Sequence, residues 1–131
     1  MIKGGCNCGA IRYEMAKEVM HHTLCHCTNC RKATGAPAVS WALVRNDQIS
    51  ITGTPVAYES SPGTYRSFCG ACGTSLFYTN QAIFPDMTDV QSATLDDPNA
   101  LTLMAQIQTA ERVGWMANLH SLPSYERFPT E

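Results

Sequence analysis

Three cysteines fall within six residues in the segment Cys25-His26-Cys27-Thr28-Asn29-Cys30. A hydrophobic core does not need three small thiols so close together, whereas Zn²⁺ takes thiolate ligands that a C-x-C-x-x-C loop can supply. A structural zinc site is closed by four protein ligands, and a catalytic site keeps one position open for water or substrate. Because the other cysteines can be paired off elsewhere, the triplet predicts an open zinc site with Cys25, Cys27 and Cys30 as its ligands.

The other four cysteines form two short motifs that together predict a closed site. Cys6 and Cys8 lie in a glycine-rich turn, and Cys69-Gly70-Ala71-Cys72-Gly73 has the pattern of a zinc knuckle. Glycine permits the positive φ that lets backbone N–H groups point at the sulfur atoms. Closing the loop between the motifs costs a few kcal/mol, well below the roughly 10–16 kcal/mol that structural zinc supplies. The alternative is that Cys6 and Cys8 are free thiols in a turn.

Two other interpretations of the clusters stay open at this stage. His21, His22 or His26 could supply a fourth ligand to the triplet and make it a second closed site. In an extended segment His26 would point away from a metal ion held by its two neighbours. A C-x-x-C pair can also be redox-active, but such pairs are followed by a helix, and a strand-like segment follows Cys72.

A zinc ion held by three thiolates is electron-rich and a poor Lewis acid, unlike the zinc of hydrolytic enzymes. Such a site suits the binding of a substrate thiol as fourth ligand, with the thiol pKa lowered from about 8.5. The bound sulfur could then attack a carbonyl carbon, or a C–S bond could be broken reversibly. Zinc nucleobase deaminases are excluded because they need H-x-E and P-C-x-x-C, and Phe68 rather than Pro precedes Cys69.

Short apolar segments separated by turn residues predict a mainly β domain that positions these cysteines. One helical turn is expected at 31–34, before Gly35-Ala36-Pro37. Segment 90–94 could be a strand, 101–108 a strand or helix, and 111–119 a short helix. The other expected strands are 11–15, 19–24, 38–44, 49–51, 56–59, 64–68 and 76–78.

The 131 residues are 44% hydrophobic and 15% charged, which predicts one globular domain over 1–131. No run of about 18 apolar residues and no apolar leader occurs, so we expect a cytoplasmic protein that does not bind membranes. In a reducing compartment, clustered cysteines favour metal ions over disulfides. The net charge of −2 and the lack of a basic stripe argue against nucleic acid as a partner. The sequence leaves the oligomeric state undetermined.

Three motifs carry a family resemblance: Gly5-Cys6-x-Cys8-Gly9, Cys25-His26-Cys27-x-x-Cys30 and Ser67-Phe68-Cys69-Gly70-x-Cys72-Gly73-Thr74. Together they resemble the glutathione-dependent formaldehyde-activating enzyme family, also called the centromere protein V-like family. The resemblance runs from about Gly4 to Tyr125, with Leu95-Asp96-Asp97-Pro98 and Trp115 among its features. It implies an Mss4-like β-tent, which is a fold of small antiparallel sheets with zinc knuckles.

The resemblance also implies two Zn²⁺ ions per chain and a reaction. A displaceable, catalytic zinc would lie on Cys25, Cys27 and Cys30, near the glutathione site. The reaction is the addition of glutathione to formaldehyde, which gives S-(hydroxymethyl)glutathione and is classed as a carbon–sulfur lyase reaction. The expected partners are therefore a small thiol such as glutathione and a small aldehyde. The structural zinc would be held by Cys6, Cys8, Cys69 and Cys72.

Residues that would surround the substrate are less marked in the sequence. Relatives often carry His-Ile-Trp where this chain has Gln106-Ile107-Gln108, which leaves a related thiol open as the substrate. A non-catalytic zinc-stabilised binding module and a thiol redox sensor are the alternative functions. Arg31, Lys32 and Arg66 could bind glutathione carboxylates, although charged residues more often lie on the surface. Trp41, Phe77 and Tyr78 could line a cleft, although such aromatic residues usually lie in the core. The candidate proton shuttles are His26 and Tyr65.

Overall fold

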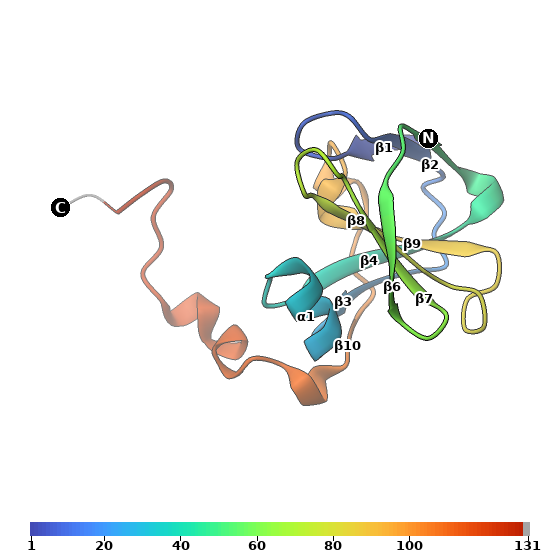
Figure 1. Ribbon diagram of the computed structural model, residues 1–131. Helices are drawn as coiled ribbons and strands as arrows, with labels where there is room; N and C mark the ends of the chain where they lie inside the picture. Colours follow the sequence, from blue (N-terminus) through green and yellow to red (C-terminus); the bar gives the residue numbers. More distant parts are fainter. Residues whose placement is uncertain (130–131) are drawn as a thin grey trace.

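The computed structural model describes residues 1–129, and its strands form two sheets (Figure 1). The smaller sheet has the order β1-β2-β5 and is antiparallel throughout. Its strands are β1 (Ile2–Gly5), β2 (Arg12–Met15) and β5 (Ile49–Thr52). The mainly β class predicted from the sequence is confirmed. The predicted domain boundary at residue 131 lies outside the described residues.

The larger sheet has seven strands in the order β10-β3-β4-β9-β8-β7-β6. Its neighbours pair antiparallel except β10 and β3, which run parallel. This pair departs from the purely antiparallel sheets that the resemblance implied. The strands are β3 (His21–Cys25), β4 (Val39–Arg45), β6 (Val56–Ser61), β7 (Thr64–Phe68), β8 (Ser75–Asn80), β9 (Met87–Gln91) and β10 (Ala105–Ile107).

The core lies between the two sheets and follows from the alternation of side chains. On β2, Tyr13 and Met15 are buried whereas Glu14 between them is exposed, as expected for successive residues of a strand. The ring of Tyr13 meets that of Phe77 edge-on at 5.6 Å between centroids. Leu76 and Val90, both fully buried, complete the same cluster. Phe77 is therefore a core residue, which was one of its two predicted roles.

The single α-helix of the described chain, α1 (Thr28–Thr34), begins three residues before the predicted helical turn. Cys27 supplies the N-cap, because its Sγ accepts a hydrogen bond from the backbone N–H of Cys30 at 3.3 Å. The helix ends at Gly35, whose φ of 68° is in the left-handed region. A ligand cysteine thus also determines where the helix starts.

The C-terminal third differs most from the sequence-based expectations. The predicted strand at 90–94 was displaced, since β9 ends at Gln91 and η2 (Ser92–Thr94) is a 3₁₀ turn. Only three residues of 101–108 form a strand, and the helix expected at 111–119 is the 3₁₀ segment η5 (Gly114–Ser121). Short 3₁₀ turns depend on local packing rather than on a clear sequence period. The others are η1 (Asn46–Gln48), η3 (Pro98–Ala100) and η4 (Thr109–Glu111).

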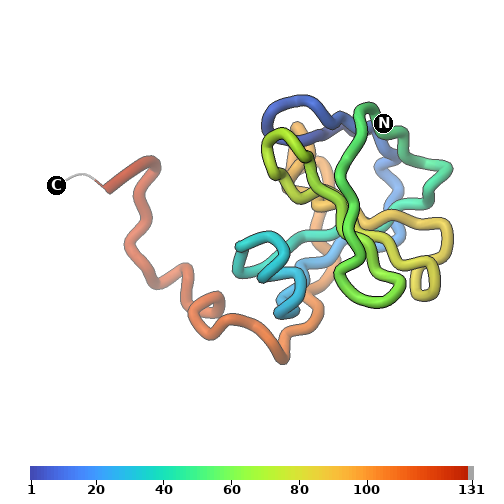
Figure 2. Tube along the Cα trace, in the orientation of Figure 1, coloured from blue at the N-terminus to red at the C-terminus, as the bar shows by residue number. Residues whose placement is uncertain are grey.

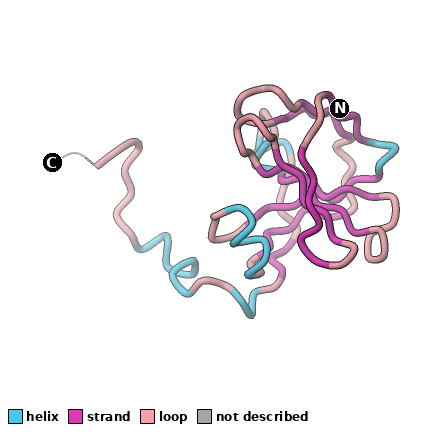
Figure 3. The backbone as a smooth tube through the Cα atoms, viewed as in Figure 1, coloured by secondary structure: helices cyan, strands magenta, loops and turns pink. Residues whose placement is uncertain are grey.

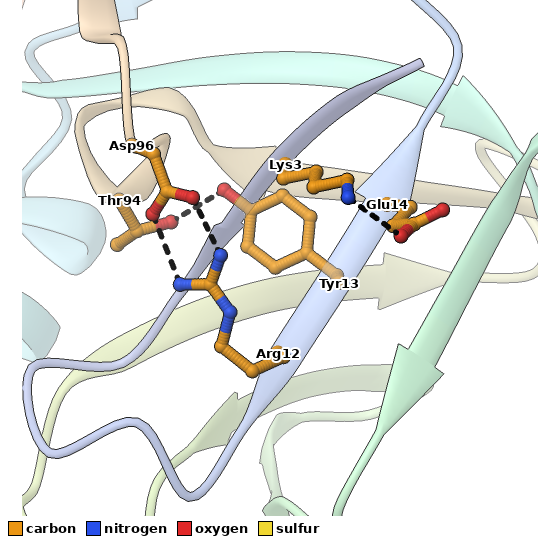
Figure 4. Close-up of polar contacts among 6 residues, drawn as sticks. All are labelled: Lys3, Arg12, Tyr13, Glu14, Thr94 and Asp96. Carbon is orange, nitrogen blue, oxygen red and sulfur yellow. Dashed lines mark hydrogen bonds and ion pairs between the residues drawn. The ribbon is translucent and has the colours of Figure 1, made fainter.

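Polar contacts join the smaller sheet to the segment that follows β9 (Figure 4). Arg12 and Asp96 form a bidentate pair, with Nη1 donating to Oδ1 at 2.9 Å. The hydroxyl of Tyr13 lies 2.8 Å from that of Thr94. Burial raises the pKa of Tyr13 to about 12, so the hydroxyl stays protonated. These contacts hold β2, and with it the turn that carries Cys6 and Cys8, against the larger sheet.

After β10 the chain leaves both sheets, as Figures 1 and 2 show. Figure 3 shows that this extension contains short helical turns separated by loops. Trp115 and Tyr125 are each 56% exposed in this extension. Across the described residues, no helix combines the length and the apolar character needed to cross a membrane.

Candidate metal centres

The first centre joins the N-terminal turn to the turn between β7 and β8. The Sγ atoms of Cys6, Cys8, Cys69 and Cys72 all lie within 4.8 Å of one another. The Cys6–Cys8 and Cys8–Cys69 sulfur separations are 3.6 and 3.8 Å. Four sulfurs placed tetrahedrally at 2.3 Å from a zinc ion would be about 3.8 Å apart. The four thiols therefore fit a closed metal site.

The local backbone of this first centre also favours thiolates. Glycines with φ of 83° and 81° follow Cys8 and Cys72, which confirms the positive φ predicted for Gly73 of the knuckle. The same prediction was wrong for Gly70, whose φ is not in the left-handed region. The N–H of Ile11 donates to the Sγ of Cys6 at 3.2 Å. The hydroxyl of Thr74, 3.1 Å from Cys72, lowers the pKa of that thiol to about 5. Donors aimed at sulfur support metal-bound thiolates in the same way.

The second centre consists of the three thiols where β3 meets α1. Cys25 ends β3, Cys27 caps the helix and Cys30 lies in its first turn. Their Sγ atoms lie within 4.8 Å of one another, and no His, Asp or Glu of residues 1–129 shares this group. The three thiols are thus close enough together to hold one metal ion, with fewer protein ligands than the first centre offers.

His26 points away from the thiol group, as its place between two ligands predicted. The ring is 1% exposed, and its Nε2 donates to the Oε1 of Gln106 at 2.8 Å. Arg112 donates to the same oxygen at 3.2 Å. The carboxylate of Glu111 accepts the N–H of Thr28 at the start of α1. Strand β10 and the segment that follows it therefore hold in place the loop that carries the three thiols.

Electrostatics differ among the three thiols. Burial raises the pKa of Cys25 to about 12. Burial has the same tendency at Cys27, but the N–H of Cys30 and other hydrogen bonds outweigh it and lower the Cys27 pKa. The buried guanidinium of Arg66 donates from Nη2 to the Sγ of Cys30 at 3.6 Å. A positive charge beside the thiol group favours its ionised form.

A cavity of about 600 Å³ opens beside the second centre, and its lining includes all three thiols. Trp41 and Tyr78 line it and lie 5.8 Å apart between ring centroids. Arg66 also lines it, with its guanidinium carbon 5.2 Å from the centre of the Tyr78 ring. The four cysteines of the first centre have no part in this lining. The cavity therefore adjoins the second centre and not the first.

The predicted substrate residues divide into two sets. Lys32 and Arg66 line the cavity, as do Trp41 and Tyr78. The cavity lining does not include Arg31, whose Nη2 instead lies 3.4 Å from the hydroxyl of Thr28. That Arg31, Lys32 and Arg66 bind glutathione carboxylates stays a prediction. The cavity lining also does not include the two candidate proton shuttles, His26 and Tyr65.

Sequence reasoning did not find a His–Asp pair in the cavity wall, because it considered His21 only as a possible metal ligand and did not consider Asp89. His21 and Asp89 both line the cavity, with His21 Nε2 3.1 Å from Asp89 Oδ1. His21 shares a face of β3 with Cys25 because alternate residues of a strand point the same way, so strand period could have found it. Asp89 has no such signal, because its place beside His21 depends on how β3, β4 and β9 pair.

Comparison with known sequences identifies the family. The family model described as glutathione-dependent formaldehyde-activating enzyme matches residues 1–111. The chain belongs to this family. The match covers both cysteine centres and extends to Glu111, which accepts the N–H of Thr28. The resemblance seen in the cysteine motifs is thereby confirmed.

The chain is similar to a protein known by its sequence and to a protein of known structure. A Schizosaccharomyces pombe protein described as an uncharacterized lyase is 32% identical over 80 residues, which cover 60% of this chain. The aligned part spans 58% of that relative's own length. A crystal structure of a Rhodobacter sphaeroides protein superposes with a TM-score of 0.63 at 23% identity, covering 80% of this chain and 99% of the other. That likeness supports the fold.

Proposed function

We propose that this protein is a zinc-dependent carbon–sulfur lyase of the formaldehyde-activating type. It would join glutathione or a related thiol to formaldehyde or a similar aldehyde. One observation carries the proposal: three convergent thiols, with no His, Asp or Glu among residues 1–129 beside them, line a cavity of about 600 Å³. Family membership and the lyase description of the S. pombe relative support the reaction class.

The two centres would hold one zinc ion each, with different tasks. Four thiols from distant parts of the chain would hold a structural ion, and such ions contribute directly to folding. The ion at Cys25, Cys27 and Cys30 would keep a position for substrate. When bound there, zinc would favour the thiolate form of a substrate thiol.

The reaction needs one bond to form and one proton to move. The substrate sulfur attacks the aldehyde carbon and forms the C–S bond, while the carbonyl π electrons move to oxygen. That oxygen takes up the proton that the thiol has lost. In this scheme Arg66 balances the charge of the thiolate group through Cys30, and the cavity-lining aromatics Trp41 and Tyr78 keep water from the reacting atoms.

Zinc-edge X-ray absorption with and without saturating glutathione tests the proposal. With one site of each kind, the mean count should rise from about 3.5 to about 4 sulfurs per zinc. Calorimetry in buffers of different ionisation enthalpy should find about one proton released per thiol bound near neutral pH. An unchanged sulfur count would remove the catalytic role and favour a non-catalytic zinc-stabilised binding module.

A further inference from the structure

A single row of cross-strand neighbours passes through the cavity wall. Residues paired directly across neighbouring strands point to the same face of a sheet. All members of the row except Leu43 line the cavity, and they include both a cation and an anion. In strand order the row is His21, Leu43, Asp89, Tyr78, Arg66 and Tyr58, on β3, β4, β9, β8, β7 and β6.

Asp89 is the unusual member of this row. It is 5% exposed, and its one side-chain hydrogen bond among the described residues joins Oδ1 to His21 Nε2. A carboxylate taken out of water is costly unless both its oxygens are paired. The cation of the row, Arg66, contacts Cys30 and Tyr78 instead. Asp89 lines the cavity, and its hydrogen bond to His21 uses Oδ1, so Oδ2 can receive a donor from within the cavity.

The His21–Asp89 pair lies at a distance from the thiol group. His21 precedes Cys25 by four residues on β3, and both line the cavity. At about 3.3 Å per strand residue, their Cα atoms are about 13 Å apart. Lys32 and Arg66 also line the cavity, and Arg66 contacts Cys30. A molecule that spans the cavity would meet thiols and Arg66 at one end and a carboxylate at the other.

We propose that Asp89, oriented by His21, binds the ammonium group of the substrate thiol. The cavity would then select thiols whose amino group lies several bonds from the sulfur, as it does in glutathione. This inference rests on the proposed function, because it needs the substrate sulfur at the Cys25–Cys27–Cys30 end. Asp89 Oδ2 accepts a hydrogen bond from the ammonium, while His21 holds Oδ1. The pair thus determines specificity and does not touch the reacting atoms.

Calorimetric titration of the purified protein, with its metal content measured, tests this inference. The probes are glutathione and N-acetylglutathione, which differ only in having an ammonium or an uncharged amide. Hydrogen bonds to charged groups predict that glutathione binds about 10- to 100-fold more tightly. The variant Asp89→Asn, which still accepts from His21, should bind the two thiols with similar affinity. His21→Gln should reduce the preference, and provides a second variant if Asp89→Asn does not fold.

Asp86→Asn is the matched control for the loss of a carboxylate. Asp86 lies just before β9, outside the cavity lining, and its carboxylate pairs with exposed Gln81. This variant should keep the full preference for glutathione. Equal binding of both thiols by the unmodified protein, or an undiminished preference in Asp89→Asn, overturns the inference and leaves the proposed function standing. Binding of neither thiol overturns both.

Discussion

Arg66 Nη2 lies 3.6 Å from the Sγ of Cys30, although the two residues are 36 positions apart. The arginine is 6% exposed and its Nη1 has no hydrogen-bond partner. One arm of the guanidinium thus supports the thiol group, and the other is buried without a hydrogen-bond partner. This contact connects β7 to α1 and gives the cavity a positive charge beside its sulfur atoms.

Replacing Arg66 should weaken thiol binding. In Arg66→Met the hydrogen bond to Cys30 and the nearby charge are lost, and contacts to charged groups contribute about 1.5–3 kcal/mol. We expect glutathione affinity to fall about 10-fold or more, measured by calorimetry. Arg45→Met is the control, because Arg45 is an exposed residue paired with Asp47. Unchanged affinity in Arg66→Met would contradict a role in substrate binding.

The two centres should differ in their effect on folding. Cys6→Ser and Cys69→Ser each remove a ligand from the four-thiol centre, and we expect unfolding or precipitation of both. Cys27→Ser should stay folded, because serine can replace Cys27 as the N-cap of α1. Thermal melts of the three variants measure this difference. Equal losses of stability would mean that the centres are not divided into a structural and a catalytic one.

The metal ions should also differ in lability. A weak chelator should remove the ion at Cys25, Cys27 and Cys30 first, because three ligands and an adjoining cavity leave it accessible. Metal analysis and circular dichroism along the titration should show one zinc lost while the fold is retained. Loss of both ions together with unfolding is the result that would oppose this assignment.

Gln106 should stabilise the thiol loop through His26. Gln106→Ala leaves the buried Nε2–H of His26 without its acceptor, and such a group costs about 1–3 kcal/mol of unfolding free energy. Denaturant unfolding of the variant measures the loss, and Gln106→Glu should recover part of it by restoring an acceptor. Gln48→Ala is the control, because Gln48 is exposed in η1. A loss no larger than that of the control would mean that the contact is not stabilising.

The Arg12–Asp96 pair should make a pH-dependent contribution to stability. The hydrogen bonds from Arg12 lower the pKa of Asp96 below its usual value of about 3.9. A carboxyl group whose pKa is lower in the folded state stabilises the folded protein at any pH above its unfolded-state pKa. This stabilisation is lost as the pH falls through the folded-state pKa. A double-mutant cycle of Arg12→Gln and Asp96→Asn should therefore give coupling at pH 7 that declines below about pH 4. Coupling that is independent of pH would exclude this ion pair as the source.

Much of the metal chemistry was already determined by short-range sequence. The spacing in Cys25-His26-Cys27-Thr28-Asn29-Cys30 and in Cys69-Gly70-Ala71-Cys72-Gly73 brings sulfurs together within a single turn, so neighbours along the chain suffice. The strands from β2 to β8 were also predictable, because alternation and turn residues are local signals. The sequence analysis missed β1 (Ile2–Gly5), where two of the four residues are glycine.

The substrate side of the cavity depends on the tertiary structure. Asp89 lies beside His21, and Arg66 beside Cys30, only because five strands pair in one particular register along the larger sheet. A shift of one residue in any strand would turn its side chains to the opposite face. Register depends on the packing of the whole sheet, so no local pattern could have placed these charges together. The sequence by itself thus determined which cysteines could hold a metal ion, and the pairing of distant strands decided which charges line the cavity beside three of them.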